Sequence, residues 1–260
     1  MSGTARATSL RQRLSEPGQL LGTFSIIPSP EIVELTALAG FDVVILDMEH
    51  GAFDLAQLSP MILAARVWGA VPVVRVRHNE PSLVSAALDA GAAGVIVPQV
   101  SSSAAAEAVV SAARFPPEGT RGANPWVRSA MYTSGGDYYR QANEDVAAMV
   151  MVEGSEGVAA VDEILAVPGL DAVFLGPVDL SNALGVHGEP EHPTVVEAVE
   201  RVVARAERRS VAVAIFASTP EAARRWLERG VKLVAVGEDT LHVLAALKAV
   251  VAAARSPADA

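Results

Sequence analysis

Hydrophobic residues along this chain gather in short runs that are separated by longer, amphipathic segments. The runs lie at 20–27, 42–49, 71–76, 94–100, 147–153, 172–176, 211–217 and 233–237. A short apolar run without strict alternation is typical of a strand that is covered on both faces in a parallel sheet. The pattern therefore predicts a series of buried parallel strands.

Capping residues mark where helices begin. Ser9 and Gln12 stand at capping-box spacing, which predicts a short helix from Leu10 that plugs one end of the fold. Ser29 and Pro30 begin a second helix. Its buried face is expected to consist of the apolar residues at helical spacing, namely Ile32, Val33, Leu35 and Leu38. Further helices are predicted near 56–68, 81–90, 103–113, 157–166, 193–208, 220–229 and 239–254.

Eight strand and helix units in about 240 residues predict an α/β protein with a (β/α)8 TIM barrel. A doubly wound open sheet is the alternative that the same pattern allows. We expect one barrel domain over 15–254, with flexible tails at 1–14 and 255–260. The alternation is interrupted at 115–146, and a segment of this length is expected to be functional or to form a helical excursion for subunit contact.

Composition narrows the classes of function. Hydrophobic residues make up 51% of the chain and charged residues 19%, yet no apolar stretch approaches the roughly 18 residues of a membrane helix. The net charge of −10 comes without a basic stripe, so neither a membrane nor a nucleic acid is an expected partner. The absence of cysteine excludes thiolate chemistry and suits the cytoplasm. The two lysines, Lys232 and Lys248, are poorly placed for a Schiff base.

Polar residues lie at the ends of several predicted strands or directly after them, where TIM barrels place their active sites. They are Asp47, Glu49 and His50 at the end of the second strand, Glu153 at the end of the fifth, Asp179 after the sixth, and Glu238 and Asp239 at the end of the eighth. Arg75 lies inside the third apolar run. A buried guanidinium requires a carboxylate or an anion as its partner.

These residue types allow more than one interpretation. Strand-end carboxylates in a chain without cysteine suggest a hard cation such as Mg²⁺ or Mn²⁺, although acids at such positions also cap helices. His50 is a candidate general base or a hydrogen-bonded structural histidine. Asp89 closes a helix at its electronegative end and therefore needs a partner. Glu238 and Asp239 would repel a phosphate, so phosphorylated substrates are not expected.

Six segments in order resemble the class II pyruvate aldolases of the HpcH/HpaI type. The resemblance spans roughly residues 15–252, and any one segment alone would be weak. The segments are Ala39-Gly-Phe-Asp with Asp47-Met-Glu-His50, Val74-Arg75, Leu88-Asp89-Ala-Gly91, Phe115-Pro-Pro117 with Gly119-Thr-Arg-Gly122, Val152-Glu153, and Gly176-Pro177-Val-Asp179-Leu-Ser181.

The resemblance implies a barrel that assembles as a homo-hexamer in which neighbours exchange the last helix. It also implies a divalent metal (Mg²⁺, Mn²⁺ or Co²⁺) and a set of residue roles. Glu153 and Asp179 would bind the metal, Asp47 and Glu49 its waters, His50 would pair with Asp89 as the acid/base, Arg75 would hold the keto and enolate oxygen, and the backbone at Gly176, Pro177 and Val178 would hold the substrate carboxylate.

The implied reaction joins the enolate of pyruvate to an aldehyde, or cleaves a 4-hydroxy-2-oxo acid in reverse. Gly154 and Met151 depart from the commonest residues of the family, which leaves the aldehyde open. The scaffold also resembles macrophomate synthase, so an enolate made by decarboxylation of oxaloacetate is an alternative. Cleavage of a CoA ester and a catalytically silent barrel used for binding or assembly are further possibilities.

Overall fold

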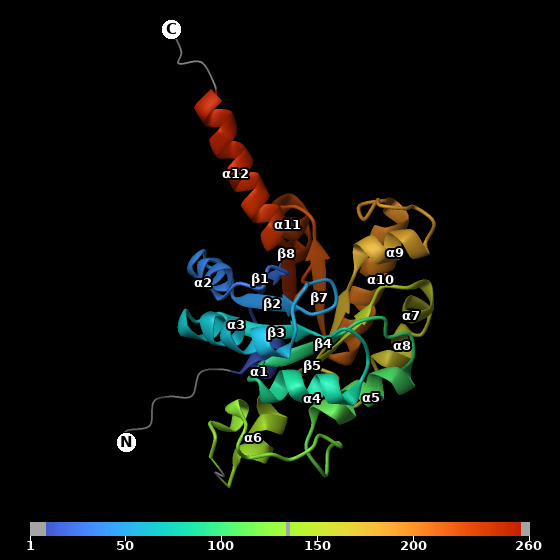
Figure 1. The fold of residues 1–260 in the computed structure, drawn as a ribbon. Coiled ribbons are helices and arrows are strands. Elements are labelled where there is room, and N and C mark those ends of the chain that lie inside the picture. Colours follow the sequence, from blue (N-terminus) through green and yellow to red (C-terminus); the bar gives the residue numbers. More distant parts are fainter. Residues whose placement is uncertain (1–8, 134–135, 256–260) are drawn as a thin grey trace.

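The apolar runs form a closed barrel of eight parallel strands in the computed structural model, which describes residues 9–133 and 136–255 (Figure 1). Each strand pairs with the next, and β8 returns to pair with β1. The strands are β1 (Leu20–Ser25), β2 (Val43–Asp47), β3 (Val71–Arg75), β4 (Gly94–Val97), β5 (Ala147–Val152), β6 (Ala172–Leu175), β7 (Ala212–Ala217) and β8 (Leu233–Glu238). The predicted TIM barrel is confirmed, and the open sheet is wrong.

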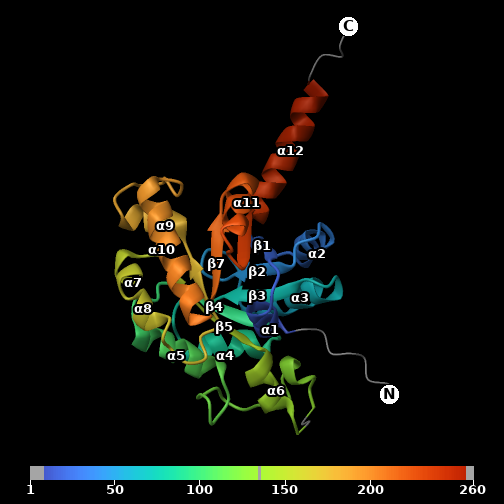
Figure 2. The ribbon, with the colours of Figure 1, turned by 180° about the vertical axis from the view of Figure 1, so that it is seen from behind.

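Helices surround the barrel in both views of the ribbon (Figures 1 and 2). The predicted ones are α1 (Leu10–Ser15), α2 (Pro30–Leu38), α3 (Leu55–Val67), α4 (Pro81–Asp89), α5 (Ser103–Ala113), α10 (Pro193–Arg209), α11 (Pro220–Glu228) and α12 (Asp239–Arg255). The helix expected at 157–166 is divided into α7 (Ser155–Ala159) and α8 (Val161–Ile164). Three short elements were not predicted: η1 (Arg128–Ala130), α6 (Tyr138–Asp145) and α9 (Pro177–Ala183).

Helix α1 closes the amino end of the barrel, as expected. The Ser9 hydroxyl accepts a hydrogen bond from the Gln12 N–H at 3.2 Å and so caps the helix. Leu10 and Leu14 are buried among the side chains that fill the barrel interior. A Cβ on Gly94 would lie only 3.0 Å from Leu10 Cδ2, so the strand must carry glycine there. The amino end is filled by apolar side chains, and the polar strand ends remain at the opposite mouth.

The described residues of the long segment, 115–133 and 136–146, pack beside this closed end. Helix α6 contacts α1, and η1 contacts α4. The Phe115 ring packs edge-on against Tyr139 at 4.8 Å between centroids, and the Arg121 guanidinium stacks over the same ring at 4.5 Å. The described part of the segment is therefore anchored at the opposite end from the mouth of its own barrel.

The expected buried face of α2 is only partly correct. Val33 is fully buried, but Leu35 and Leu38 are 61% and 55% exposed, and Ala37 takes the second inward position. Val33 and Ala37 stand four residues apart on one side of the helix, and this side faces the sheet. Leu35 and Leu38 point away from the barrel, so they leave an apolar surface on α2.

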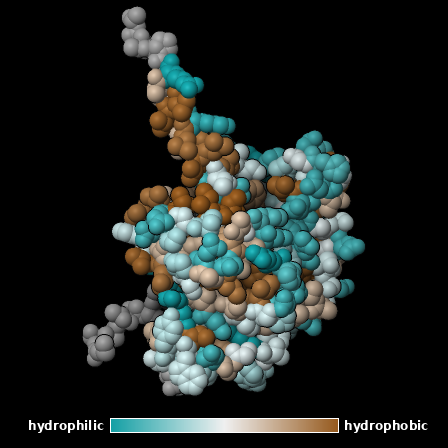
Figure 3. All heavy atoms as spheres, in the orientation of Figure 1, coloured by the Kyte–Doolittle hydropathy of each residue, from teal (hydrophilic) through white to brown (hydrophobic). Residues whose placement is uncertain are grey.

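Helix α12 projects from the body of the protein in both ribbon views (Figures 1 and 2). Its side chains from Leu241 to the end of the helix are all exposed, although Leu244, Leu247 and Val250 are large and apolar. Figure 3 shows hydrophobic residues along this helix and on the adjoining surface of the barrel. Among the described residues, no helix is long and apolar enough to cross a membrane.

The predicted tails lie mostly outside the described residues. Positions 1–8 and 256–260 are not described, whereas α1 occupies the last part of the range 1–14. Residues 10–14, which were expected in the amino-terminal tail, therefore belong to a helix.

Candidate active site

A bidentate ion pair joins the ends of β2 and β3. Asp47 and Arg75 are register partners in the sheet. Arg75 Nε donates to Asp47 Oδ1 at 2.8 Å, and Nη2 donates to Oδ2 at 2.7 Å. Both residues are buried. Burial alone would lower the pKa of Arg75, but the hydrogen bond and the charge of Asp47 raise it, so the guanidinium stays charged. The partner that sequence analysis required for Arg75 is thus Asp47.

The third nitrogen of Arg75 faces weaker partners. Nη1 lies 3.1 Å from Glu49 Oε2 and 3.8 Å from the sulfur of Met151. Glu49 Oε2 is buried and accepts no hydrogen bond. Burial raises the pKa of Glu49, and the positive charge of Arg75 opposes this effect. Nη1 and Glu49 Oε2 therefore both retain hydrogen-bonding capacity for a bound molecule or ion.

The loop after β2 presents His50 at the surface of the same region. Asp47 Oδ1 accepts the N–H of Glu49 at 3.0 Å and of His50 at 3.4 Å. From the segment that follows β3, Arg77 donates to the carbonyls of Met48 and Phe53 at 3.0 Å each. Arg77 thus fixes both sides of the loop that carries His50, a role that sequence analysis missed.

Glu153 follows β5 and is buried. Its Oε1 accepts the backbone N–H of Gln99 at 2.8 Å. Burial raises the pKa of Glu153 to about 6; the hydrogen bond from Gln99 lowers it, and the negative charge of Asp179 raises it. A Cβ on Gly176 would lie 3.0 Å from Glu153 Oε2, so glycine after β6 provides the space for this carboxylate.

Asp179 lies in the first turn of α9, which begins directly after β6. It is exposed and lines a cavity of about 460 Å³ at the barrel mouth together with Glu49, His50 and Glu153. The other lining residues are Gln99, Val100, Ser101, Gly154, Ser155, Glu156, Gly157 and Ala183. The structure thus brings strand-end carboxylates from β2, β5 and β6 into one cavity.

The donor set fits a hard divalent cation with few protein ligands. Within 9–133 and 136–255, no group of three or more His, Cys, Asp or Glu side chains is arranged to hold a metal ion by itself. Mg²⁺ commonly uses one or two carboxylates and keeps several waters. Glu153 and Asp179 provide two such carboxylates, and the unsatisfied Glu49 Oε2 could accept a hydrogen bond from a coordinated water. A cation would also relieve the repulsion that raises the pKa of Glu153.

Asp89 has a partner within the chain that was not predicted. Its Oδ1 accepts a hydrogen bond from Arg121 Nη2 at 2.6 Å, and within the described residues no hydrogen bond joins Asp89 to His50. Helix α4 returns from the carboxyl end of β3 toward the start of β4, so Asp89 lies at the closed end of the barrel. A single chain does not bring the two residues together.

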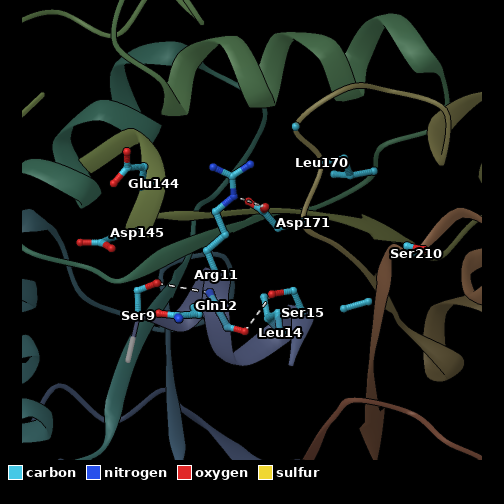
Figure 4. A pocket seen from close by; sticks show the side chains of 12 residues that line it. Ser9, Arg11, Gln12, Leu14, Ser15, Glu144, Asp145, Leu170, Asp171 and Ser210 are labelled. Atoms are coloured by element: carbon cyan, nitrogen blue, oxygen red, sulfur yellow. Dashed lines mark hydrogen bonds and ion pairs between the residues drawn. The ribbon is translucent and has the colours of Figure 1, made fainter. Parts of the chain in front are cut away.

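A larger cavity, of about 620 Å³, lies at the closed end beside α1. Figure 4 shows Arg11 reaching toward Asp171 there, with Ser9 and Ser15 nearby. Arg11 Nε and Arg114 Nη2 both lie 2.7 Å from the Asp171 carboxylate. These charges tie α1 and α5 to the start of β6. Because TIM-barrel chemistry is found at the carboxyl ends of the strands, we assign the candidate site to the smaller cavity.

Comparisons with known proteins show which family and which solved structures this chain is similar to. The profile of the HpcH/HpaI aldolase/citrate lyase family matches residues 20–246. The 5-keto-4-deoxy-D-glucarate aldolase of Escherichia coli (strain K12 / DH10B) is 38% identical over 219 residues, which cover 84% of this chain and 86% of the relative. A family protein from Burkholderia cenocepacia J2315 superposes with a TM-score of 0.91 at 38% identity, over 95% of this chain and 99% of that one. Macrophomate synthase superposes with a TM-score of 0.84 at 29% identity, over 95% and 89%.

The ion pair predicts unequal effects of two similar substitutions. Asp47→Asn leaves Arg75 without its bidentate carboxylate and should lower the free energy of unfolding by about 3 kcal/mol. Glu49→Gln removes a carboxylate oxygen that accepts no hydrogen bond, and should change it by no more than about 1 kcal/mol. Urea unfolding followed by circular dichroism measures both. Equal losses in the two variants would contradict the role given to Asp47.

Proposed function

The chain belongs to the HpcH/HpaI aldolase/citrate lyase family, and from this premise we propose a divalent-metal-dependent lyase that acts through the enolate of pyruvate. It joins this enolate to an aldehyde, or releases it from a 4-hydroxy-2-oxo acid. The observation that carries the proposal is the cavity at the barrel mouth, where Glu153, Asp179 and Glu49 lie together. The charged Arg75 lies behind Glu49, with 3.1 Å between Arg75 Nη1 and Glu49 Oε2.

Glu153 and Asp179 are the proposed metal ligands, and Asp47 and Glu49 the proposed partners of its waters. Mg²⁺, Mn²⁺ and Co²⁺ are all compatible with oxygen ligands of this kind. When bound, the cation would supply positive charge that polarises the 2-keto group of pyruvate. Of Asp47 and Glu49, it is Glu49 that has an oxygen available to accept a hydrogen bond from such a water, because both oxygens of Asp47 already bind Arg75.

Arg75 is the proposed donor to the keto oxygen, which gains negative charge as the enolate forms. Two of its nitrogens are fixed by Asp47, and Nη1 has only Glu49 and the weak acceptor Met151 nearby. A donor held in place before the reaction stabilises developing charge without reorganising. The backbone at Gly176, Pro177 and Val178, where α9 begins, is proposed to hold the carboxylate of the substrate.

His50 is the proposed acid/base, since it lines the cavity and histidine is the side chain that most often transfers protons in enzymes. The pairing of His50 with Asp89 stays a prediction. Because Asp89 lies at the closed end of its own barrel, the pair can form only between two copies of the chain. The proposed pairing and the proposed homo-oligomer therefore depend on each other.

Helix α12 supports assembly into an oligomer. Its apolar residues Leu244 and Leu247 are 51% and 60% exposed, and Leu35 and Leu38 of α2 add a second exposed apolar surface. Exposed apolar patches of this kind mark protein interfaces. We propose a homo-hexamer in which α12 packs on a neighbouring copy.

A decarboxylase is the second candidate. The similarity to macrophomate synthase over most of both chains favours an enolate-forming site, and the same cavity could form the enolate from oxaloacetate. The retained carboxylate and keto oxygens would bind in the same way. A rate of oxaloacetate turnover far above any retro-aldol rate would favour this candidate.

Proton exchange tests the proposed enolate directly. In D₂O with Mg²⁺ or Mn²⁺, the enzyme should remove the methyl signal of pyruvate from the proton NMR spectrum, and EDTA should stop the loss. Glu153→Ala should slow the exchange by about 100-fold or more, because it removes a proposed metal ligand. Glu163→Ala, on the exposed side of α8, is the matched control. Exchange that survives EDTA or Glu153→Ala would contradict the proposal.

Two glycines near Glu153 provide a second test. A methyl group on Gly176 would crowd the Glu153 carboxylate, whereas one on Gly154 would meet nothing within 4 Å. Gly176→Ala should weaken Mn²⁺ binding by about tenfold, and Gly154→Ala should leave it within about twofold. Electron paramagnetic resonance of free Mn²⁺ measures both affinities. The assignment of Glu153 as a ligand fails if Gly176→Ala binds Mn²⁺ as tightly as the unaltered protein.

The oligomer depends on the apolar face of α12. The double change Leu244→Glu with Leu247→Glu should lower the molar mass in light scattering toward the 27.0 kDa of one chain, because it places two charges in the proposed interface. Ala249→Glu, on the other side of the helix by its 100° spacing, is the control. An unchanged mass in the double variant would contradict the interface.

A further inference from the structure

One side of the cavity carries side chains that the proposed enolate chemistry does not use. Gln99 and Ser101 follow β4, and Ser155 and Glu156 begin α7 after β5. We propose that the carboxamide of Gln99 recognises the second substrate, and that this substrate is a short, uncharged, hydroxylated aldehyde. This inference rests on the proposed function, because it assigns the acceptor of the same enolate.

The backbone fixes Gln99 at this position. Its φ angle is +56°, in the left-handed region that residues other than glycine rarely adopt. The N–H of Gln99 donates to Glu153 Oε1 at 2.8 Å, and the next N–H, of Val100, donates to the carbonyl of Met151 at 3.0 Å. Unfavourable backbone conformations persist where the surrounding contacts enforce them, often at functional sites. The turn after β4 is therefore held against β5, and the exposed side chain of Gln99 lines the cavity.

The lining around Gln99 suits hydroxyl groups better than apolar ones. A carboxamide both donates and accepts hydrogen bonds, and so do the hydroxyls of Ser101 and Ser155. Apart from the glycines, the apolar residues that line the cavity are Val100 and Ala183, and Val100 is only 2% exposed. An acceptor with an apolar tail would gain little contact with these side chains and would displace water from the carboxamide without replacing its hydrogen bonds, which lowers affinity.

Charge argues against an anionic acceptor. The described lining residues include four carboxylates, from Glu49, Glu153, Glu156 and Asp179, and neither lysine nor arginine. Arg75 lies behind Glu49 and is already paired with Asp47. A bound divalent cation would offset two of these charges and pyruvate would add one, so the set would stay net negative and disfavour a carboxylate or phosphate on the aldehyde. An uncharged molecule with a hydroxyl beside the aldehyde fits both the charge and the hydrogen-bonding groups.

Three small aldehydes separate these possibilities when each is combined with pyruvate and Mg²⁺. Glycolaldehyde carries a hydroxyl, propionaldehyde has a methyl group in the same place, and glyoxylate carries a carboxylate. The kcat/KM for glycolaldehyde should exceed those for the other two by about tenfold or more, because a site built to bind a hydroxyl rejects the analogue that lacks it. Equal or better turnover of propionaldehyde or glyoxylate would overturn the inference.

Two substitutions test Gln99 itself. Gln99→Gly keeps the N–H and accepts the positive φ, but removes the carboxamide, so the ratio of kcat/KM for glycolaldehyde to propionaldehyde should fall by about tenfold. Gln99→Asn keeps a carboxamide on a residue that tolerates the left-handed region, and should retain part of the preference. The ratio cancels general damage to the site. An unchanged ratio in Gln99→Gly would overturn the role of Gln99.

Exchange of pyruvate protons without any aldehyde keeps the two levels of the proposal apart. If the enzyme exchanges these protons with metal but shows no preference for glycolaldehyde, the acceptor assignment is wrong and enolate formation stands. If it exchanges no protons, the proposed function fails and the acceptor assignment fails with it.

Discussion

A buried ion pair, Arg75 with Asp47, sets the geometry of the barrel mouth. Taking both charges out of water is costly, and the cost is offset because two parallel hydrogen bonds join them. The same carboxylate accepts the N–H groups of Glu49 and His50. One interaction thus orients the guanidinium, begins the loop that carries His50, and leaves Arg75 Nη1 directed at Glu49. Without the pair, the charged groups of β2 and β3 would have no fixed relation to the cavity.

The other side of the mouth is held by contacts of a different kind. Glu153 is buried, accepts one backbone N–H from Gln99, and is given space by Gly176. Its raised pKa reports burial first and then the nearby charge of Asp179. A cation would stabilise the charged form of Glu153, because this carboxylate is poorly solvated and close to another acid. The proposed role of Gln99 in binding the aldehyde depends on the same arrangement. The N–H that binds Glu153 belongs to Gln99, and the side chain of Gln99 lines the cavity.

Much of this structure could be predicted because the buried strands of a parallel barrel are short apolar runs in the sequence. The apolar runs predict the strands. The polar residues at the ends of the runs include Asp47, Glu49, His50, Glu153 and Asp179, which the sequence therefore predicts at the mouth of the barrel. The strand at 42–49 ends earlier, at Asp47, because the carboxylate of Asp47 turns the next residues into a loop. Leu35 and Leu38 were expected inside and lie outside, since helical spacing finds an apolar face without saying what covers it. Arg121 as the partner of Asp89, and the left-handed Gln99, leave no periodic signal in the sequence, because both depend on contacts between distant segments.

The location of a bound metal tests this account most directly. A crystal of the protein grown with Mn²⁺ and pyruvate should give an anomalous peak between the carboxylates of Glu153 and Asp179, with Arg75 facing the keto oxygen of pyruvate. In the same crystal, Asp47 should remain bound to Arg75, and Glu49 should lie near the waters that coordinate the metal. A Mn²⁺ peak elsewhere in the barrel, or pyruvate bound away from these carboxylates, would contradict the assignment of the site.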